Sequence, residues 1–578
     1  MTDRFTARIF RRLWIPAIVS SVGWAVSDIA DAVVVGQRMG SVGLAAISLI
    51  LPVYMINCFL AHGFGIGGSV RYSKLLGDGR VKDAVLNFNR VARAVLGVSV
   101  LTAVLGNVFM EESLRALGTV PADGALYAAT KSYLRILVTA APLFYLSNLL
   151  NYYLRNDDNG KLAGIGSVAG NTLDIALNVL FVLVLGMGTA GAALSTAAGQ
   201  ALAILIYLPG LFGKAHILRI KKTTFAPGCA FSAFREGASG SAQYLFSLVF
   251  IMFSNNYLIR AGGETSVAVF DMLQNAAYLI LYLYEGTIRA MQPLVSAYHG
   301  ERWSAGELSA LRLSFVYGCA AGIVMAFIIA VFAGQTCALF GLEDEEAMTI
   351  GISALRLFCA GSVFAGVSLL SAGYFQSCGR ERLSFVISAI RGCVVLLPVT
   401  MALALWGADM FWQLFLVTEA LSLPIWMLYA KFHERAKDQF DPSRIWHGSV
   451  RGKNEEIIAI NEGAEAFCEH WGAEPQQAFY VTMSIEELCL AIIQNGFTDS
   501  NASDCYIKIT IAAETDGTFT LHIRDNARYF NPFSLHTNRA SEGGDFDMDA
   551  MGLSIIKQKA KDFFYRQYGG FNSLVVKI

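Results

Sequence analysis

Long apolar stretches recur about a dozen times between Leu13 and Ala430, and from Asp441 the sequence changes to charged segments with alternating hydrophobic positions. A helix needs about 20 apolar residues to cross a bilayer core of roughly 30 Å. The pattern therefore predicts an all-α membrane part of about twelve transmembrane helices. The predicted spans are 13–36, 44–70, 88–110, 133–153, 162–185, 189–212, 238–260, 266–293, 313–335, 352–377, 383–405 and 409–430.

The segment after Asp441, which we call the tail, has the pattern of a soluble domain. Hydrophobic positions alternate in YIKITIAAE, TFTLHIRD and NSLVVKI, and EIIAINEGAEAFCEHW and SIEELCLAIIQNGF have a helical period. Helices packed on one face of an antiparallel sheet fit this order. We expect a soluble α/β two-layer sandwich.

The membrane part contains two similar halves. In GFGIGGSVRYSKLLGDGR, Ser73 precedes Gly77 by four residues, and in EGTIRAMQPLVSAYHGERW, Ser296 precedes Gly300 by the same spacing. A parallel repeat with a cavity at its interface is a common plan for transporters. We therefore predict two six-helix lobes and a tail, with the ranges 1–220, 221–438 and 439–578.

Composition and charge agree with a membrane protein and give an orientation. Hydrophobic residues make up 55% of the chain and charged residues 15%, which is too apolar for a soluble protein of 578 residues. Lys and Arg gather in alternate short loops, and such loops face the cytoplasm. We expect both termini in the cytoplasm, in the inner membrane of a prokaryote. The ten cysteines and eight histidines show no ligand-like grouping, so no metal site is expected. We also expect no nucleic-acid partner.

Three carboxylates lie inside predicted spans of the first half. A charge there costs about 3 kcal/mol on insertion scales, so it usually faces a cavity and handles ions. Counted along the helices, Asp28 and Asp31 lie about 24 to 28 Å from one membrane face, and Asp174 with Asn178 about 20 to 25 Å. Asn171 shares their helix face. These five residues are our candidate ion-coupling site. The alternative is that Asp31 caps its helix and Asp174 is a buried hydrogen-bonding group.

The second half supplies polar candidates for a substrate cavity, namely Gln243, Asp271, Glu285 and Gln292. Glu285 lies in the middle of a predicted helix. It either meets a cationic substrate or pairs with Arg289 one turn further on.

The membrane part resembles the multidrug and toxic compound extrusion family, the MATE transporters. The resemblance rests on ADAVVVGQRMGSVGLAAIS, LRNDDNGKLA, LNVLFVLVLGMGTAGAALST and the Gln292–Pro293 segment. It implies twelve helices in two lobes, alternating access, and export of organic cations or other amphiphiles against H⁺ or Na⁺. In the family, an acid of the first helix matches Asp31. The fifth helix carries Asn and, four residues later, Asp, whereas here Asp174 and Asn178 are exchanged.

The tail resembles the histidine-kinase-like ATPase fold, nearest the anti-sigma-factor serine kinases. Glu487 matches the family's acid, Asp525 its adenine-binding Asp and Gly552 its last glycine motif. The metal-binding Asn is replaced by Ala491, and Asn495 lies one helical turn beyond it. The resemblance leaves two readings open: ATP as a ligand of the tail, or a tail that binds a cytosolic regulatory protein.

Two functional hypotheses follow. In the first, the chain is a secondary active antiporter in the lipid bilayer. It exports small cationic or amphiphilic compounds in exchange for H⁺ or Na⁺ and is not an enzyme, because ATP hydrolysis by the tail lacks its metal ligand. In the second, the membrane part is a ligand sensor that signals through the tail without net transport.

Overall fold

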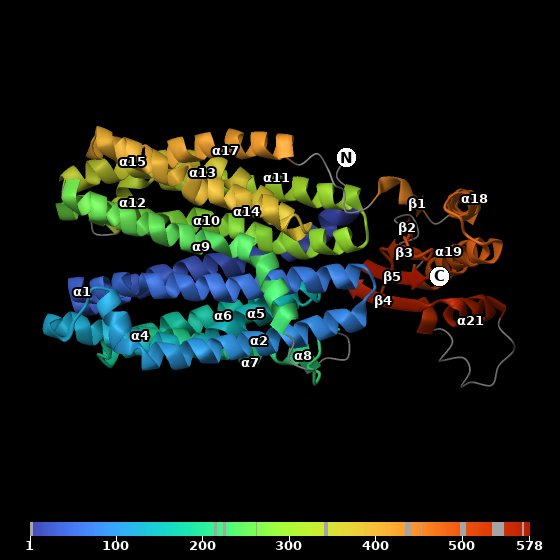
Figure 1. Cartoon of the computed structure of the whole chain (residues 1–578), viewed down its shortest axis with the longest axis horizontal. Helices are drawn as coiled ribbons and strands as arrows, with labels where there is room; N and C mark the ends of the chain where they lie inside the picture. Colours follow the sequence, from blue (N-terminus) through green and yellow to red (C-terminus); the bar gives the residue numbers. More distant parts are fainter. Residues whose placement is uncertain are drawn as a thin grey trace.

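The computed structural model describes most of the chain. The described residues are 4–212, 217–223, 227–261, 263–339, 345–433, 441–451, 454–497, 505–534, 548–568 and 571–578. Within them, a membrane part of long helices adjoins a tail built on a β-sheet (Figure 1).

The first lobe comprises the helices between Arg4 and Phe212. Its longest helix, α1, is broken at Gly40, where φ is 58°, so that it supplies two spans. Helices α4 and α5 meet at a bend of 50°. The elements are α1 (Arg4–Gly77), α2 (Val81–Val108), α3 (Met110–Ala116), η1 (Pro121–Asp123), α4 (Ala125–Thr139), α5 (Ala141–Asn156), α6 (Gly160–Asn178), η2 (Val179–Val184), α7 (Gly188–Tyr207) and α8 (Pro209–Phe212).

The second lobe comprises the helices between Pro227 and His433. Each lobe contains one π-helical segment: η2, of six residues, lies at the end of the predicted span 162–185, and η3, of five residues, lies in the middle of the predicted span 383–405. Such segments often occur at functional sites. The elements are α9 (Pro227–Ala261), α10 (Gly263–Gly300), α11 (Ser304–Val331), α12 (Ala333–Leu339), α13 (Glu345–Ser377), α14 (Glu381–Ala389), η3 (Ile390–Val394), α15 (Leu396–Trp406), α16 (Ala408–Phe411) and α17 (Leu414–His433).

The two lobes are copies of one plan. Helices α2 and α11 each have 28 residues, and the short helices α3 and α12 that follow them each have 7. The hairpins before α2 and α11 contain matching left-handed residues, Gly79 (φ 74°) and Arg302 (φ 58°). Ser69 and Gln292, 223 residues apart, contact each other. Because equivalent positions can touch only near the axis that relates them, this axis passes between α1 and α10.

Ten described helices are long and apolar enough to cross a membrane, and the bent pair α4–α5 raises the number to eleven. The remaining predicted span, 238–260, falls in α9, which has 35 residues but is not among these candidates. Residues 237–259 of α9 contain no Asp, Glu, Lys or Arg and are long enough to cross a bilayer core. The architecture is thus the predicted one of two six-helix lobes.

The tail is a two-layer sandwich. Its five strands are antiparallel and lie in the order β1-β2-β3-β5-β4. Alternate residues such as Ile509, Leu521 and Leu574 pack against the helices of the tail. The elements are η4 (Pro442–Arg444), β1 (Ile445–Val450), α18 (Asn454–His470), α19 (Pro475–Gly496), β2 (Ile507–Ala513), β3 (Phe519–Asp525), η6 (Pro532–Ser534), α21 (Met548–Lys559), β4 (Asp562–Tyr568) and β5 (Phe571–Lys577).

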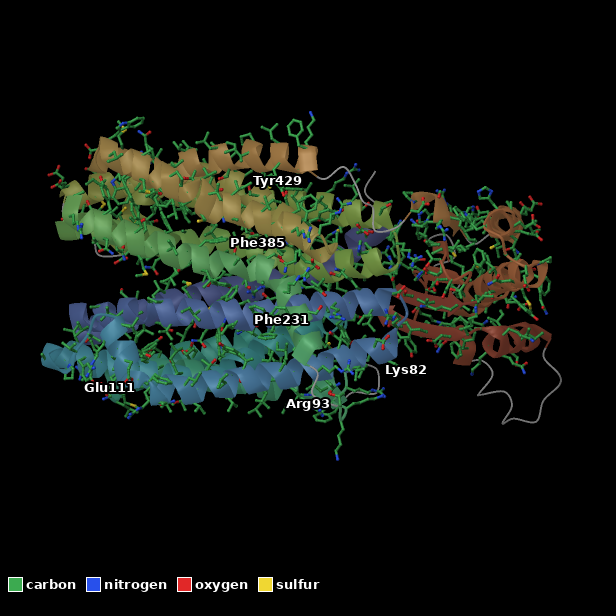
Figure 2. All side chains as sticks on the ribbon, viewed as in Figure 1. Lys82, Arg93, Glu111, Phe231, Phe385 and Tyr429 are labelled. Atoms are coloured by element: carbon green, nitrogen blue, oxygen red, sulfur yellow. The ribbon has the colours of Figure 1, made fainter. Side chains whose placement is uncertain are left out.

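The tail lies at one end of the helical bundle, with its strands toward the bundle and its helices farther out (Figure 1). We call this the tail end. Lys82 lies at the tail end and Glu111 at the opposite, far end (Figure 2). Large apolar side chains along the bundle, among them Ile165, Val316 and Phe327, are exposed, as expected for side chains that contact lipid.

Candidate functional site

The polar faces of α1 and α6 meet inside the first lobe. Asn178 donates a hydrogen bond from Nδ2 to Oδ1 of Asp31, and Ser27 donates to Oδ2 of Asp174 at 3.1 Å. Asp174 and Asn178 are buried, whereas Asp31 is half-buried. The structure therefore brings two of the three predicted acids, Asp31 and Asp174, into one site, which we call the acid face.

Asn171 lies about one helical turn before Asp174, on the same side of α6. Its Nδ2 is 3.2 Å from the place where a Cβ on Gly23 of α1 would be, so the missing side chain at Gly23 makes room for the amide. Within the described part of the chain, Asn171 Nδ2 and Asp174 Oδ1 are buried without a hydrogen-bond partner. Buried groups left in this state are suited to a bound ion or water. The side chain of Asp28 lies outside the described residues.

A small cavity, partly open to solvent, lies between the lobes. Three of the four predicted cavity residues, Gln243, Glu285 and Gln292, line it together with Tyr152 of the first lobe and Arg289. Asp271 does not line it and is exposed elsewhere on α10. The lining combines apolar side chains with a few polar groups, which is typical of small-molecule sites.

Glu285 pairs with Arg289, which was one of the two expected alternatives. Arg289 donates to the carboxylate at 2.6 Å and is 3% exposed. Its guanidinium carbon lies 4.1 Å from the ring centre of Trp24 and 5.8 Å from that of Tyr152. The cavity wall therefore contains a cation held by aromatic rings.

His62 extends this aromatic wall. Its Nδ1 lies 3.0 Å from the hydroxyl of Tyr152, and its ring stacks on Tyr244 with 5.1 Å between ring centres. These aromatic contacts were not predicted, because aromatic residues in apolar spans have no periodic signal that distinguishes a cavity wall from lipid-facing positions.

A second ion pair, half-buried, lies in the second lobe between Arg391 of η3 and Glu419 of α17, at 2.7 Å. Sequence reasoning missed it, although a charge inside a span is the signal that would have found it.

The lobes meet at the tail end through glycines, in a contact that we call the seam. A Cβ on Gly77 of α1 would lie 2.5 Å from the carbonyl oxygen of Ala297 and 3.0 Å from Cα of Gly300. Gly67 of α1 contacts the backbone of α9 at Ala233 and Gly237 just as closely. Backbones approach this closely only where no side chains intervene, so the two lobes are in direct contact along the seam.

In the tail, the residues expected to bind a nucleotide contact other groups of the protein. Asp525 is buried and accepts hydrogen bonds at Oδ1 from Nδ2 of Asn572 at 2.7 Å and from the backbone N–H of Ala527 at 2.9 Å. Glu487 lies against Gly552, where a Cβ would be 2.5 Å from both carboxylate oxygens. Asn495 donates to the backbone carbonyl of Ala491 at 3.1 Å. The polar groups that were expected to contact a nucleotide therefore contact other protein groups in this structure.

Burial raises the pKa of Asp525 from its ordinary value to about 7, and the hydrogen bond from Asn572 partly opposes this effect. On the opposite face of the same strand, burial lowers the pKa of His522 to about 3. Burial therefore keeps His522 neutral near pH 7, whereas Asp525 changes between its protonated and ionised forms at this pH.

One group of possible metal ligands occurs among the described residues, although the sequence showed none. Ligand atoms of His299, Glu307 and Cys378 lie within 4.8 Å of one another. The Cys378 thiol donates to Glu307 at 3.4 Å, and His299 Nδ1 is 3.2 Å from the same carboxylate. The three residues come from α10, α11 and the end of α13, so only the tertiary fold brings them together.

Comparison with known proteins agrees with this geometry. The MatE family model matches residues 16–180 and 239–401, and the model of the histidine kinase-like ATPase domain matches residues 450–578. The two MatE matches begin at equivalent positions of the repeat. The chain is 24% identical to the multidrug export protein MepA of Staphylococcus saprophyticus, over 73% of this chain and 93% of that protein. It is 22% identical to MepA of Staphylococcus aureus, over 70% and 89%.

Solved structures share the fold of the membrane part. An outward-facing multidrug resistance MATE transporter of the MOP superfamily aligns with a TM-score of 0.66 and 24% identity, over 75% of this chain and 98% of that one. The MATE multidrug transporter DinF-BH aligns with a TM-score of 0.65 and 23% identity, over the same shares. At this identity the likeness concerns the fold alone. Because the family model covers both lobes, the chain belongs to the MATE family and carries a C-terminal histidine kinase-like ATPase domain.

Proposed function

We propose that this protein is an ion-coupled efflux transporter that exports small organic cations or other amphiphiles in exchange for H⁺ or Na⁺. The cavity between the lobes is the observation that carries the proposal, because it offers a ligand three glutamines, the ring of Tyr152 and the ion pair of Glu285 with Arg289. MepA relatives named as multidrug export proteins support the substrate class.

The arrangement of the lobes supports alternating access as the transport mechanism. The seam closes the tail end, and the two lobes meet there near their repeat axis. Rocking of the lobes about this axis would open the cavity first to one side and then to the other. We place the tail end in the cytoplasm, because the basic loops lie there.

The acid face is the proposed coupling site. Asp31 and Asp174 are held by Asn178 and Ser27, and Oδ1 of Asp174 is buried without a hydrogen-bond partner among the described groups. A proton or Na⁺ bound there would neutralise buried charge, and its release would change the contacts between α1 and α6. Because α1 also packs on α10, the coupling ion and the substrate would act on the same helix.

The test is uptake of a fluorescent organic cation into proteoliposomes under an imposed H⁺ or Na⁺ gradient. We expect wild type to accumulate the dye with one ion, and Asp31→Asn and Asp174→Asn each to lose at least about tenfold of that rate, since one charge binds the ion. Asp409→Asn, which removes an exposed carboxylate, is the matched control.

Equal uptake by the two acid-face variants and wild type would contradict the coupling site. Dye binding without accumulation under either gradient would favour the sensor hypothesis, in which the tail reports on the membrane part.

A further inference from the structure

The tail sheet has one face covered by its own helices and another that contacts the membrane part. We call the second face the open face. Register aligns Lys508, Arg524, Ser573 and Arg566 across β2, β3, β5 and β4, and all four side chains point away from the tail's core. The open face therefore carries a row of three cations.

This row contacts the hairpin between α10 and α11. Glu301, 4% exposed, forms an ion pair with Arg524, accepts a hydrogen bond from Ser573 at 3.2 Å, and lies 3.7 Å from Arg566. Lys508 lies 3.7 Å from the ring centre of the buried Trp303. A buried carboxylate with several charged donors is costly to separate from them.

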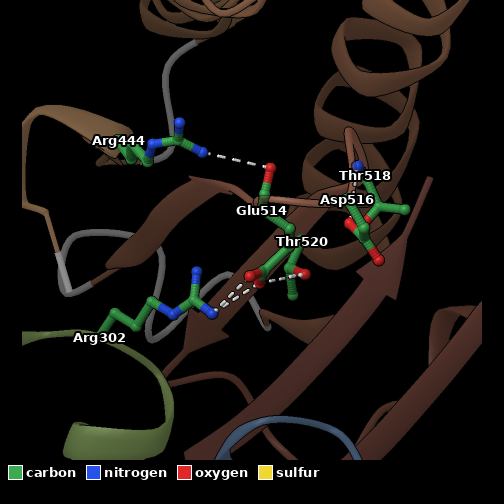
Figure 3. A network of polar contacts seen from close by, with 6 residues as sticks. All are labelled: Arg302, Arg444, Glu514, Asp516, Thr518 and Thr520. Atoms are coloured by element: carbon green, nitrogen blue, oxygen red, sulfur yellow. Dashed lines mark hydrogen bonds and ion pairs between the residues drawn. The ribbon is translucent and has the colours of Figure 1, made fainter. Parts of the chain in front are cut away.

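A second ion pair flanks the first. Arg302 bonds Glu514 at 2.7 Å, and Glu514 also accepts from Thr520 at 3.1 Å and, through its backbone carbonyl, from Arg444 at 3.4 Å (Figure 3). The two side chains of the pair are 12% and 24% exposed. The pair fixes the hairpin to the turn between β2 and β3.

The same open face contacts the first lobe. At Gly79, in the hairpin between α1 and α2, a Cβ would lie 2.9 Å from Cγ1 of Val575. Phe564 packs with the core of the first lobe, and the ring of Phe5, at the start of α1, lies 3.6 Å from that of Phe571. The open face thus holds both hairpins at once.

The two contacted hairpins are equivalent in the repeat, since Gly79 and Arg302 are the matching left-handed residues. The seam, with Gly77 against Gly300, lies directly beside these hairpins. When the lobes rock apart at the tail end, the two hairpins must separate, and a sheet bound to both cannot follow both.

We propose that the tail is an intramolecular clamp whose open face holds the seam closed, so that the cavity opens to the tail end only when the open face is released. This inference rests on the proposed function for its consequence, but the clamp itself is independent of transport. Anything that binds the released tail would favour opening, and opening would favour that binding by the same factor.

Hydrogen exchange of the full-length protein in nanodiscs tests the clamp without a substrate. Glu301→Gln removes the partner of two arginines, and Arg302→Glu turns the second ion pair into a repulsion. We expect amide exchange in residues 297–303, in β5 and in the seam segment 63–77 to rise by about fivefold or more, a typical coupling between sites.

The charge exchange Arg302→Glu with Glu514→Arg restores an ion pair of opposite polarity and should return the exchange rates toward wild type. A variant that had merely misfolded would not be rescued in this way. Glu112→Gln, at an exposed carboxylate of α3, is the control and should leave these rates unchanged.

Unchanged exchange in residues 297–303 in both single variants would overturn the contact. Faster exchange in that hairpin with an unaltered seam segment would overturn the clamp while keeping the contact. Failure of transport in every variant, wild type included, would count against the proposed function alone, because the exchange measurement does not use a substrate.

Discussion

At the scale of single residues, the acid face shows how few side chains define the proposed coupling site. Gly23, Ser27 and Asp31 of α1 follow one another at intervals of one turn and meet Asn171, Asp174 and Asn178 of α6 in the same order. Because both helices run in the same direction, the exchange of Asp174 and Asn178 relative to the family pattern moves a carboxylate by one turn along this face.

Asp525 gives a residue-scale prediction for the tail. Its pKa is about 7 when folded and ordinary when unfolded, so the folded tail binds the proton more tightly and stability is lost as pH rises from about 4 to 7. Three pKa units correspond to about 4 kcal/mol. Asp525→Asn removes this pH dependence. As pH rises from about 4 to 7, the free energy of unfolding of the variant minus that of wild type should therefore increase, because only wild type loses stability at this site.

The measurement is hydrogen exchange of β2 and β3 amides in urea, corrected for the intrinsic pH dependence of exchange. Burial lowers the pKa of His522 and of His447, so these two residues make the folded tail more stable as pH rises. Their effect is the same in wild type and in the variant, and it cancels when the two free energies are subtracted. A difference independent of pH would show that Asp525 does not titrate in this range.

At the scale of elements, the seam depends on glycines where helices cross. A Cβ on Gly67 would overlap the carbonyl of Ala233 and lie 2.5 Å from the backbone nitrogen of Gly237. Neither backbone group can rotate away as a side chain would. The close approach of α1 and α9 therefore requires a residue without a side chain at position 67.

We expect Gly67→Ala to destabilise the closed seam by about 1–3 kcal/mol, the usual cost of overpacking. Exchange at residues 233–240 should rise, and dye transport should slow. The control is Gly97→Ala in α2, where a Cβ meets nothing within 4 Å. Equal behaviour of the two variants would mean that the seam is not closed in the membrane.

Elements were predictable where a local pattern encodes them. Apolar length identified the spans, spacing identified the repeat at Ser73 and Ser296, and alternation identified β2, β3 and β5. The π-helical segments η2 and η3 were not predicted, because the change of backbone hydrogen-bond partners in a π-helix does not alter the spacing of hydrophobic residues in the sequence. The cavity residues were found in part: polarity inside a span selects Glu285 and Asp271 alike, and only packing shows which of them lines the cavity.

At the scale of the whole molecule, the contact between the tail and the lobes could not be predicted from the sequence. Arg524 and Arg566 look like solvated charges in alternating strands, and Glu301 looks like an ordinary loop acid. The register of three strands and the position of one hairpin must both be known before they can be paired. The tail thus contacts the lobes through the open face, which its own helices leave uncovered.

The central claim is that substrate and coupling ion move in opposite directions through one molecule. The most direct measurement is the H⁺ or Na⁺ concentration inside proteoliposomes, reported by an enclosed ion-sensitive dye, when an organic cation is added outside and no ion gradient is imposed. The account predicts that entry of the organic cation drives H⁺ or Na⁺ out of wild-type vesicles, that Asp174→Asn abolishes this efflux and that Asp409→Asn retains it. Entry of the organic cation without movement of either ion, or binding of the organic cation without entry, would contradict it.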